Sequence, residues 1–441
     1  MASPPRLPQT IPAEQEARRC RILFADQLNL ARGKYVPMSQ ARKGRARLCV
    51  GTYAVTYDKQ MIAAPGGGVL EGLPDMEIAF DPDDLRKSWE PGTAIALGEL
   101  HGPHGPFPLC GRSALKRAIT AWRERGLEPM VGIEMEAYIF QRDEHGGWVP
   151  YDTPGAFVYG TGPFSDPAGL LDDIWDVAAA CDLPIESINA EFDAPQFELT
   201  LHYSDALKAA DDAFLFRQMA REVLYRRGYL LSFLPKPLTG KSGSGLHFNL
   251  SFQDAGGTNV FAESVETGRF SPVMSGAIAG MLRHHRALTA ILAPVTNSYA
   301  RLQPASLAGY WANWGHDHRS VTVRVSGEKG PAARIEHRLA DGAASPYFAM
   351  AALLEAASLG VTNGYDLPAP ETADGMDHVG TDIHAPHDLA EALDSLEADR
   401  QLTAALGAEM IANFVSIKRR EIEILADLSM DGQIAYYLHY I

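Results

Sequence analysis

Closely spaced carboxylates on apolar segments are the first feature of this 441-residue sequence that could do chemistry. In the run Gly132-Ile-Glu-Met-Glu-Ala-Tyr-Ile-Phe, Glu134 and Glu136 lie two positions apart among apolar residues. Side chains two apart on a strand share one face, so the pattern places the two carboxylates side by side. Burying two like charges is costly unless cations compensate them. The spacing therefore predicts a strand whose polar face holds a cation.

Three further segments mix charged and apolar residues in the same way. Glu191 and Glu198 frame the residues Phe-Asp-Ala-Pro-Gln-Phe, with Glu186 five positions earlier. Two other segments each place three polar side chains on one face of a predicted strand. These side chains are His247, Asn249 and Ser251 in one segment, and Arg334, Glu336 and Arg338 in the other.

Together these segments offer five glutamates and one histidine, which are enough ligands for two adjacent metal sites. The candidate ligands are Glu134, Glu136, Glu191, Glu198, His247 and Glu336. Oxygen-rich sets with one imidazole suit Mg²⁺ or Mn²⁺ rather than a metal that prefers thiolates. The alternative is that each segment is the exposed face of a half-solvated sheet. Four such segments in one chain favour the metal interpretation.

Two divalent ions together with several arginines are typical of phosphoryl transfer, because both neutralise charge on the moving phosphate. No Cys or Ser stands in a recognisable nucleophile motif. The segment Lys241-Ser-Gly-Ser-Gly-Leu-His supplies backbone N–H groups near the candidate ligands, but it matches neither a P-loop nor a dinucleotide fingerprint.

Two domains are expected to position these residues. Short strands are predicted at Arg21 to Ala25, Leu48 to Tyr57 and Thr93 to Leu100, so residues 1–110 are expected to form a small β-rich domain. From Ser113 the apolar spacing becomes helical, which places the boundary near residue 110.

Residues 111–441 are predicted to form an α+β domain with one antiparallel sheet backed by helices. Strands are expected at Val131 to Phe140, Ile188 to Leu201, Leu246 to Phe252, Val321 to Val325 and Ala333 to Leu339. Helices are expected at Ala168 to Cys181, Asp205 to Arg227, Ser275 to Ala290, Tyr347 to Leu359 and through the tail from Asp388.

Composition restricts the class of partner. The formal charge of −16 disfavours nucleic acid, because the surface field should repel phosphate backbones. No run of about 18 apolar residues and no signal peptide are found, so neither a membrane partner nor secretion is expected. The four cysteines lie far apart without a C-x-x-C pair, which is typical of reduced thiols. We expect a cytoplasmic protein.

A series of motifs in chain order resembles the glutamine synthetase superfamily, and the resemblance covers nearly the whole chain. Gly132-Ile-Glu-Met-Glu is similar to the paired-glutamate strand, and Glu191 to Glu198 to E-x-x-x-x-Q-x-E. The remaining matches are Ser242-Gly-Ser-Gly-Leu-His, Asn297-Ser-Tyr-Ala-Arg-Leu, His318-Arg-Ser-Val-Thr-Val-Arg, Arg334-Ile-Glu-His-Arg-Leu-Ala-Asp and Ser345-Pro-Tyr-Phe-Ala-Met-Ala-Ala. The resemblance implies a β-grasp-like domain, residues 1–110, and a catalytic domain, residues 111–441, with a curved antiparallel sheet.

The resemblance also implies roles for individual residues. One ion would be held by Glu136, Glu191 and Glu198, and the other by Glu134, His247 and Glu336. ATP would meet Glu186 at the ribose, Arg319, Arg324 and Arg334 at the phosphates, and Asn249 and Ser251 nearby. Glutamate would meet Arg301 and Arg338, beside Ser242 and Gly243, with Arg301 and Arg319 as catalytic residues. The implied reaction forms an acyl phosphate from the glutamate γ-carboxylate and ATP, which an amine then converts to an amide. The implied assembly is a large homo-oligomer such as a dodecamer.

Two departures from the family pattern concern the amine. The flap glutamate of the family should lie six residues after Arg301, where this chain has Leu307, and the family's F-D-G-S-S segment is missing from residues 48–58. An ammonium ion needs carboxylates, whereas an organic amine needs apolar room. We therefore expect an organic amine, with Leu307, Tyr310, Trp311 and Trp314 as the candidate pocket wall. An ammonium-using glutamine synthetase and a catalytically silent relative stay open as alternatives.

Overall fold

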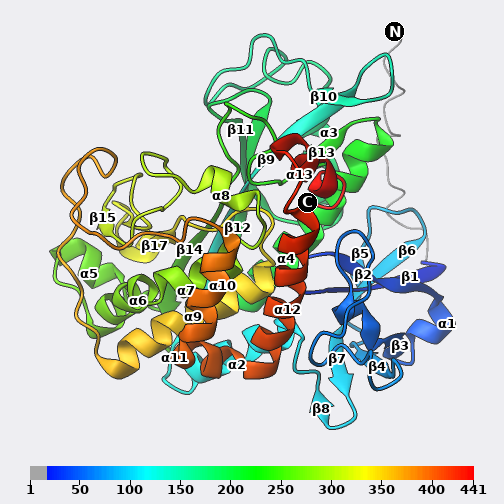
Figure 1. The fold of residues 1–441 in the computed structure, drawn as a ribbon, viewed down its shortest axis with the longest axis horizontal. Helices are drawn as coiled ribbons and strands as arrows, with labels where there is room; N and C mark the ends of the chain where they lie inside the picture. Colours follow the sequence, from blue (N-terminus) through cyan, green and yellow to red (C-terminus); the bar gives the residue numbers. More distant parts are fainter. Residues whose placement is uncertain (1–16) are drawn as a thin grey trace.

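Two small sheets make up the first part of the described chain (blue in Figure 1). The structure is a computed structural model that describes residues 17–441, so residues 1–16 of the predicted N-terminal domain lie outside the described residues. One sheet has the order β2-β1-β6-β5, with β1 Arg19–Ala25, β2 Ala31–Pro37, β5 Arg86–Lys87 and β6 Thr93–Leu97. The other has the order β3-β4-β7-β8, with β3 Arg45–Cys49, β4 Asp75–Ala79, β7 Glu99–Gly102 and β8 Gly105–Pro106.

The strand predicted at Leu48 to Tyr57 is only partly correct. It ends at Cys49, and η1, a 3-10 helix, spans Val50–Ala54. Asn413 of a C-terminal helix donates from its side-chain nitrogen to the Tyr53 carbonyl at 2.8 Å, and Tyr53 is fully buried. The apolar run is therefore buried in a turn against a helix, not in a sheet, because tertiary contacts override a short strand pattern.

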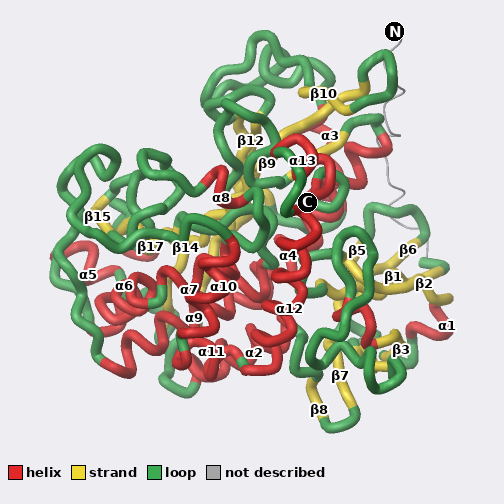
Figure 2. The backbone as a smooth tube through the Cα atoms, in the orientation of Figure 1, coloured by secondary structure: helices red, strands yellow, loops and turns green. Residues whose placement is uncertain are grey.

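A nine-stranded sheet forms the centre of the molecule (Figures 1 and 2). Its order is β11-β12-β9-β14-β17-β16-β15, and β10 and β13 also pair with β9. The strands are β9 Glu128–Arg142, β10 Trp148–Pro150, β11 Ile185–Ala190, β12 Gln196–Asp205, β13 Leu230–Ser232, β14 Leu246–Gln253, β15 Trp314–His316, β16 Val323–Val325 and β17 Ile335–His337. All pairs are antiparallel except β15 with β16.

Most helices gather on one side of this sheet, as the red segments of Figure 2 show. They are α2 Gly111–Arg123, α3 Leu170–Ala180, α4 Ala206–Arg226, α5 Ala262–Thr267, α6 Pro272–Arg283, α7 His285–Leu292, α8 Ser298–Arg301, α9 Pro346–Asn363, α10 Leu389–Ala398, α11 Arg400–Leu406, α12 Ala408–Leu425 and α13 Met430–Tyr437. The short elements α1 Met38–Ala41 and η2 Gly330–Ala332 complete the set. The predicted α+β class is confirmed. Within residues 17–441 no helix is long and apolar enough to cross a membrane.

Three predicted elements are each divided in two. The strand expected at Thr93 to Leu100 is β6 followed by β7, which belong to different sheets. The strand expected at Ile188 to Leu201 is the pair β11 and β12 with a turn between them, so Glu191 lies in the turn. The helix expected at Ser275 to Ala290 is α6 followed by α7, separated at His284. The Nδ1 atom of His284 lies 2.5 Å from Asp399 Oδ2, which fixes the chain at this break.

Helix α4 joins the central sheet to the first part of the chain. Glu222 on α4 accepts from Arg21 of β1 at 2.8 Å, and Asp211 on α4 accepts from Arg112 at the start of α2 at 2.9 Å. One hydrophobic core runs through both parts, from Cys20 to Ile441. Strand β8 ends at Pro106 and α2 begins at Gly111; the domain boundary near residue 110 stays a prediction.

Candidate active site

The strand register brings the candidate metal ligands onto one face of the central sheet. Glu198 on β12 lies opposite Glu136 on β9, and Glu134 on β9 lies opposite His247 on β14. Glu336 on β17 lies opposite the next polar residue of β14, Asn249. Since side chains alternate along a strand, these pairings gather the polar side chains that each strand carries into one patch.

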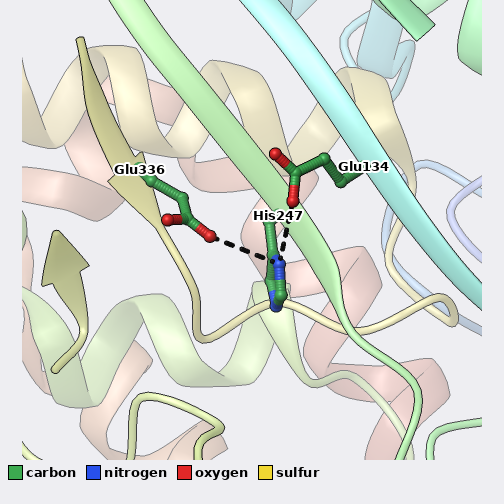
Figure 3. Close-up of side chains that lie close together, drawn as sticks. All are labelled: Glu134, His247 and Glu336. Carbon is green, nitrogen blue, oxygen red and sulfur yellow. Dashed lines mark ion pairs between the residues drawn. The ribbon is translucent and has the colours of Figure 1, made fainter. Parts of the chain in front are cut away.

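The first group of ligand atoms comprises Glu134, His247 and Glu336, shown in Figure 3. His247 Nδ1 lies 3.5 Å from Glu134 Oε2 and 3.4 Å from Glu336 Oε1, and the three ligand atoms lie within 4.8 Å of one another. The side chain of Asn249 donates to Glu134 at 2.7 Å and fixes the direction of that carboxylate. The group therefore presents three converging ligand atoms.

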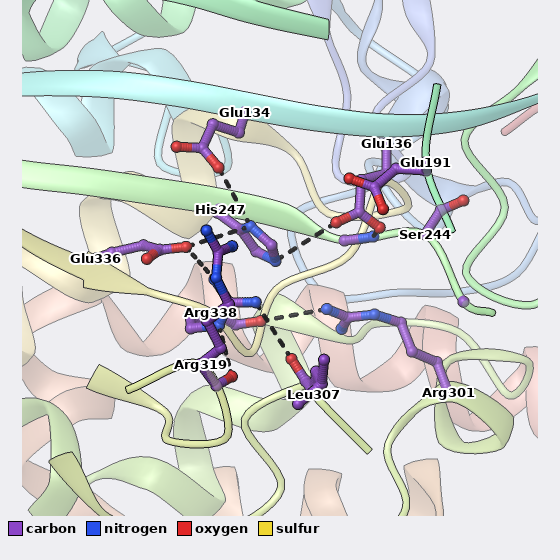
Figure 4. A network of polar contacts seen from close by, with 12 residues as sticks. Glu134, Glu136, Glu191, Ser244, His247, Arg301, Leu307, Arg319, Glu336 and Arg338 are labelled. Carbon is purple, nitrogen blue, oxygen red and sulfur yellow. Dashed lines mark hydrogen bonds and ion pairs between the residues drawn. The ribbon is translucent and has the colours of Figure 1, made fainter. Parts of the chain in front are cut away.

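The second group comprises Glu136, Glu191 and Glu198, whose ligand atoms also lie within 4.8 Å of one another. Glu191 comes from the turn between β11 and β12, which the bond from its N–H to the Gln196 carbonyl closes at 2.8 Å. His247 Nε2 lies 3.8 Å from Glu136 Oε1, so the imidazole of the first group also contacts the second group (Figure 4).

The pKa values show that these carboxylates are crowded. Burial, together with the charges of its glutamate neighbours, raises the pKa of Glu198 to about 8, and burial and Glu136 raise the pKa of Glu191. Burial alone would raise the pKa of Glu134 as well, but His247, Asn249 and Arg338 lower it to about 2. Repelling carboxylates with one imidazole at this spacing fit two hard divalent cations such as Mg²⁺ or Mn²⁺.

Three arginines surround the same patch (Figure 4). Arg301 on α8 is buried and donates to the Leu339 carbonyl at 2.7 Å and the Arg338 carbonyl at 3.2 Å. Arg338 donates from Nε to the Arg319 carbonyl at 3.1 Å and from Nη1 to Glu336. Backbone carbonyls and carboxylates thus preorganise the guanidinium groups, which suits recognition of a carboxylate or phosphate.

Two glycines leave room for these side chains. A Cβ on Gly243 would lie 2.5 Å from Arg301 Cγ, and a Cβ on Gly245 would lie 2.6 Å from His247 Nε2 and 2.9 Å from Arg301 Nη2. The Gly245 N–H also donates to Glu136 at 2.8 Å. The Gly-rich segment therefore allows close packing of arginine and histidine and binds a carboxylate of the cluster.

A cavity of about 480 Å³ opens beside the cluster. Ten of the predicted site residues line it: Glu134, Glu136, Glu191, Glu198, Ser242, Gly243, His247, Arg301, Arg319 and Arg338. A second cavity, of about 280 Å³, is lined by predicted ATP-binding residues, namely Glu186, Asn249, Ser251 and Arg334, and again by Glu134. Glu134 therefore lies on the boundary between the two cavities.

Some predicted residues lie outside both linings. Glu336 lies 3.4 Å from His247 Nδ1 but lines neither cavity. Arg324 donates to Glu336 at 3.1 Å and to Asp317 and also lines neither cavity. Of the four residues expected to wall the amine pocket, only Leu307 lines the 480 Å³ cavity.

The expectation for the other three wall residues is corrected by their packing. Trp314 is buried and its indole N–H donates to the Pro368 carbonyl at 2.8 Å. Tyr310 stacks on His384, with ring centroids 5.4 Å apart, and Trp311 packs edge-on against the same ring. These three rings pack toward the segment after α9, where the Pro368 carbonyl accepts from Trp314 and the His384 ring contacts Tyr310 and Trp311.

Several lining residues were missed by sequence reasoning. Gln196 donates to the Gly243 carbonyl at 2.9 Å and to Glu136 at 3.3 Å, and its place two before Glu198 on β12 was a usable signal. Lys236, Val158, Tyr159 and Phe192 also line the 480 Å³ cavity. They come from loops, where no side-chain periodicity indicates which residues face a site.

Residues 108–437 match the family described as glutamine synthetase, catalytic domain. The match covers more than half of the chain, so the chain belongs to the glutamine synthetase family. The family is one of ligases that generally use ATP and divalent metal ions. The predicted family and ligase class are confirmed.

Named relatives include enzymes with different acceptors. A glutamine synthetase of Methanosarcina mazei is 30% identical, over 96% of this chain and 95% of that protein. A γ-glutamylethanolamide synthetase of Streptomyces coelicolor is 32% identical, over 84% of this chain and 81% of that protein. The solved structure of apo GmaS has a TM-score of 0.81 at 28% identity and covers 94% of this chain and 95% of that chain.

Proposed function

We propose that this chain joins the γ-carboxylate of glutamate to an organic amine, in an ATP-dependent reaction that passes through γ-glutamyl phosphate. The observation that carries the proposal is the junction of the two cavities. Glu134 lines both cavities and belongs to one group of converging ligand atoms, and the other group, Glu136, Glu191 and Glu198, lines the 480 Å³ cavity beside it. A phosphoryl group passing from one substrate to another needs concentrated positive charge at such a junction.

In this proposal each group of ligand atoms holds one divalent cation. Glu134, His247 and Glu336 would hold one ion, and Glu136, Glu191 and Glu198 the other. The bound ions would neutralise charge on the phosphate oxygens.

ATP would occupy the 280 Å³ cavity, with its ribose near Glu186 and its phosphates near Arg334, directed toward Arg319 in the neighbouring 480 Å³ cavity. Glutamate would occupy the 480 Å³ cavity near Arg301 and Arg338. Arg324 would act through the carboxylate of Glu336, to which it is bonded, and would not touch a phosphate directly.

The chemistry would proceed in two balanced steps. An oxygen of the γ-carboxylate attacks the terminal phosphorus of ATP, and the bond between that phosphorus and ADP breaks. The amine nitrogen then attacks the acyl carbon, the C–O bond to phosphate breaks, and the nitrogen loses a proton to phosphate or water. Arg301, Arg319 and Arg338 would orient the carboxylate and stabilise charge as it develops.

We propose an organic amine rather than ammonium because of the side chain that lines the 480 Å³ cavity where the amine would bind. Leu307 lines it where the family has a carboxylate, and that side chain is 48% exposed. The relative named a γ-glutamylethanolamide synthetase supports the same choice. Ammonium as the acceptor is the second candidate, favoured by the relative named a glutamine synthetase.

The test is a measurement of ADP release and of the amide product by mass spectrometry, with glutamate, Mg²⁺, ATP and either ammonium or an amine panel. We expect glutamate-dependent ADP release with a higher kcat/KM for an organic amine than for ammonium. A preference for ammonium would refute the acceptor assignment. Absence of product with every acceptor would favour the catalytically silent alternative.

We also propose that the enzyme works in the cytoplasm as a large homo-oligomer such as a dodecamer. All four cysteines are free thiols, which suits a reducing compartment. The resemblance supports the assembly, since relatives of this family commonly form oligomers. Light scattering on the purified protein measures the assembly size, and a monomer would contradict the proposal.

A further inference from the structure

The mouth of the 480 Å³ cavity carries an apolar rim made by the side chains of Val158, Tyr159, Phe192 and Leu307. Phe192 is 74% exposed, Tyr159 65% and Leu307 48%. Single exposed apolar residues are ordinary on a protein surface. Three large ones at the entrance of a charged cavity are unusual and indicate a binding surface for an apolar group.

Backbone contacts tie this rim to the ligand groups. The Tyr159 N–H donates to the Ala190 carbonyl at 2.8 Å, directly before Glu191. The Phe192 N–H donates to the Glu191 carboxylate at 3.0 Å. Two sides of the rim are therefore attached to the turn that carries one of the candidate metal ligands, so an apolar group bound there lies close to the reacting centre.

The local backbone also shows that the rim is a specific arrangement. Tyr159 has φ of +60° and Ala305, two residues before Leu307, has φ of +54°. A left-handed conformation costs a bulky residue about 1 kcal/mol or more and persists only where surrounding contacts hold it. The Leu307 carbonyl faces Arg338 Nη2 at 3.5 Å, which links the third side of the rim to the cavity wall.

The charges inside the cavity exclude one class of amine. All four carboxylates that line it belong to the two ligand groups, and its other charged side chains are Lys236, Arg301, Arg319 and Arg338, besides the imidazole of His247. Asp193 lies next to the rim, but its Oδ2 accepts from the N–H and the hydroxyl of Ser242 at 2.5 and 2.8 Å, and its Oδ1 lies 3.6 Å from the ammonium group of Lys241. A second ammonium group on the acceptor would meet cations and find no carboxylate left to pair with it.

We propose that the acceptor is a primary monoamine whose uncharged apolar arm packs on Val158, Tyr159, Phe192 and Leu307, and that diamines are rejected. This inference rests on the proposed function, since it assigns the amine of that same reaction. The arm would be recognised by burial of apolar surface, and the amine nitrogen would lie toward the cluster. Each methylene group buried against the rim should raise kcat/KM roughly fourfold.

The first experiment compares matched acceptors on the purified full-length protein with Mg²⁺, ATP and glutamate. The series is methylamine, ethylamine, propylamine, butylamine and benzylamine, with 1,4-diaminobutane and ethanolamine as polar counterparts. We expect kcat/KM to rise along the monoamines and the diamine to fall at least about tenfold below butylamine, since its second charge has no partner. A flat series, or a diamine equal to butylamine, overturns this inference while the ligase function stands. If no product forms with any acceptor, both this inference and the proposed ligase function are refuted.

The second experiment changes the rim. Phe192→Ala should lower kcat/KM for butylamine about tenfold more than for methylamine, because only the longer arm reaches the ring. Phe164→Ala is the matched control, since Phe164 is 77% exposed in the same region but does not line the cavity. Leu307→Glu should reverse the preference for butylamine over the diamine, because the new carboxylate can pair with the second ammonium group of the diamine. If Phe192→Ala affects both amines equally, or if Leu307→Glu leaves the diamine-to-butylamine ratio unchanged, the rim does not bind the arm.

Discussion

The two halves of the 480 Å³ cavity are built in different ways. Its floor stands on β9, β12 and β14, where the register places Glu136 opposite Glu198 and Glu134 opposite His247. Its rim comes from loops, with Tyr159 and Leu307 on segments that have no regular structure. In the proposed reaction the floor would hold the groups that act on the phosphate, whereas the rim would contact the amine.

This difference predicts that floor residues determine catalytic activity and that rim residues determine which amine is used. Floor residues share hydrogen-bonded strands, so one substitution disturbs several carboxylates at once. Rim residues would contact only the substrate arm and are themselves uncharged, so their substitutions should act independently. Changes in the floor should therefore remove activity with every amine, and changes in the rim should alter the choice among amines.

The largest effect is expected for Glu136→Gln. The amide keeps the shape but loses the negative charge that a divalent ion needs, and loss of several kcal/mol of stabilisation corresponds to a fall of about 10³-fold in kcat/KM. Mn²⁺ binding, followed by its paramagnetic resonance signal, should weaken in parallel. The control is Glu128→Gln at the first residue of β9, where Glu128 only pairs with Arg123 at 2.6 Å. Wild-type Mn²⁺ affinity in Glu136→Gln would contradict the assignment of this carboxylate.

The next effect tests whether the floor depends on packing as well as on charge. Gly245→Ala would place a methyl group 2.6 Å from His247 Nε2 and 2.9 Å from Arg301 Nη2, so both side chains must move. A displacement of about 1 Å near the reacting atoms can cost roughly 100-fold in kcat. Gly102→Ala is the control, because its nearest neighbour would lie 3.7 Å away. Equal kcat values for the two variants would show that the close approach at Gly245 is not needed.

A smaller effect is expected in the second cavity, where strand and loop meet. Arg334 follows η2 and donates from Nε to Asn249 on β14 at 3.0 Å. Arg334→Ala should raise the KM for ATP about tenfold, since a hydrogen bond to a charged group contributes on the order of 1.5–3 kcal/mol, while the KM for glutamate changes little. The matched control is Lys329→Ala, since Lys329 is exposed and pairs with Glu266. A rise of equal size in the KM for glutamate would contradict the assignment of Arg334 to ATP binding.

The difference between strand residues in the floor and loop residues in the rim also explains how much of the site the sequence could predict. Alternation along β9, β14 and β17 predicts from the sequence that Glu134, His247 and Glu336 lie on the polar faces of their strands, because period-two spacing fixes which side chains share a face. Register between strands is not visible in such spacing. The family resemblance implied that Glu136 and Glu198 share an ion, and the structure adds that they lie opposite each other on paired strands.

The turn and loop residues show the limit of sequence pattern. Glu191 was expected on a strand and lies in a turn, and Tyr310 was expected at the amine but stacks on His384. Phe192 was passed over although it follows Glu191 directly. Loop side chains take their direction from tertiary contacts, which no local spacing encodes.

The smallest expected effect concerns a second buried histidine of the central sheet. This histidine lies on the sheet face that packs against helices, not on the polar face that carries the ligand groups. His337 follows Glu336 on β17 and so points to the other side, where it is 1% exposed and neither ring nitrogen has a hydrogen-bond partner in the described structure. Burial, with smaller contributions from His285 and His247, lowers the pKa of His337 to about 3. The folded protein therefore keeps this imidazole neutral.

A lowered histidine pKa means that the unfolded chain binds a proton more readily, so the stability is present above pH 6.5 and is lost as the pH falls toward 3. Between pH 7 and pH 5.5 this one group should cost about 1 kcal/mol of unfolding free energy. His337→Phe should reduce that loss in urea unfolding, whereas His145→Gln, at an 84% exposed side chain, should leave the pH dependence unchanged. An unchanged pH slope in His337→Phe would mean that the imidazole is solvated or paired in the folded protein, and would contradict its assignment as a buried neutral group on the helix-packed face of β17.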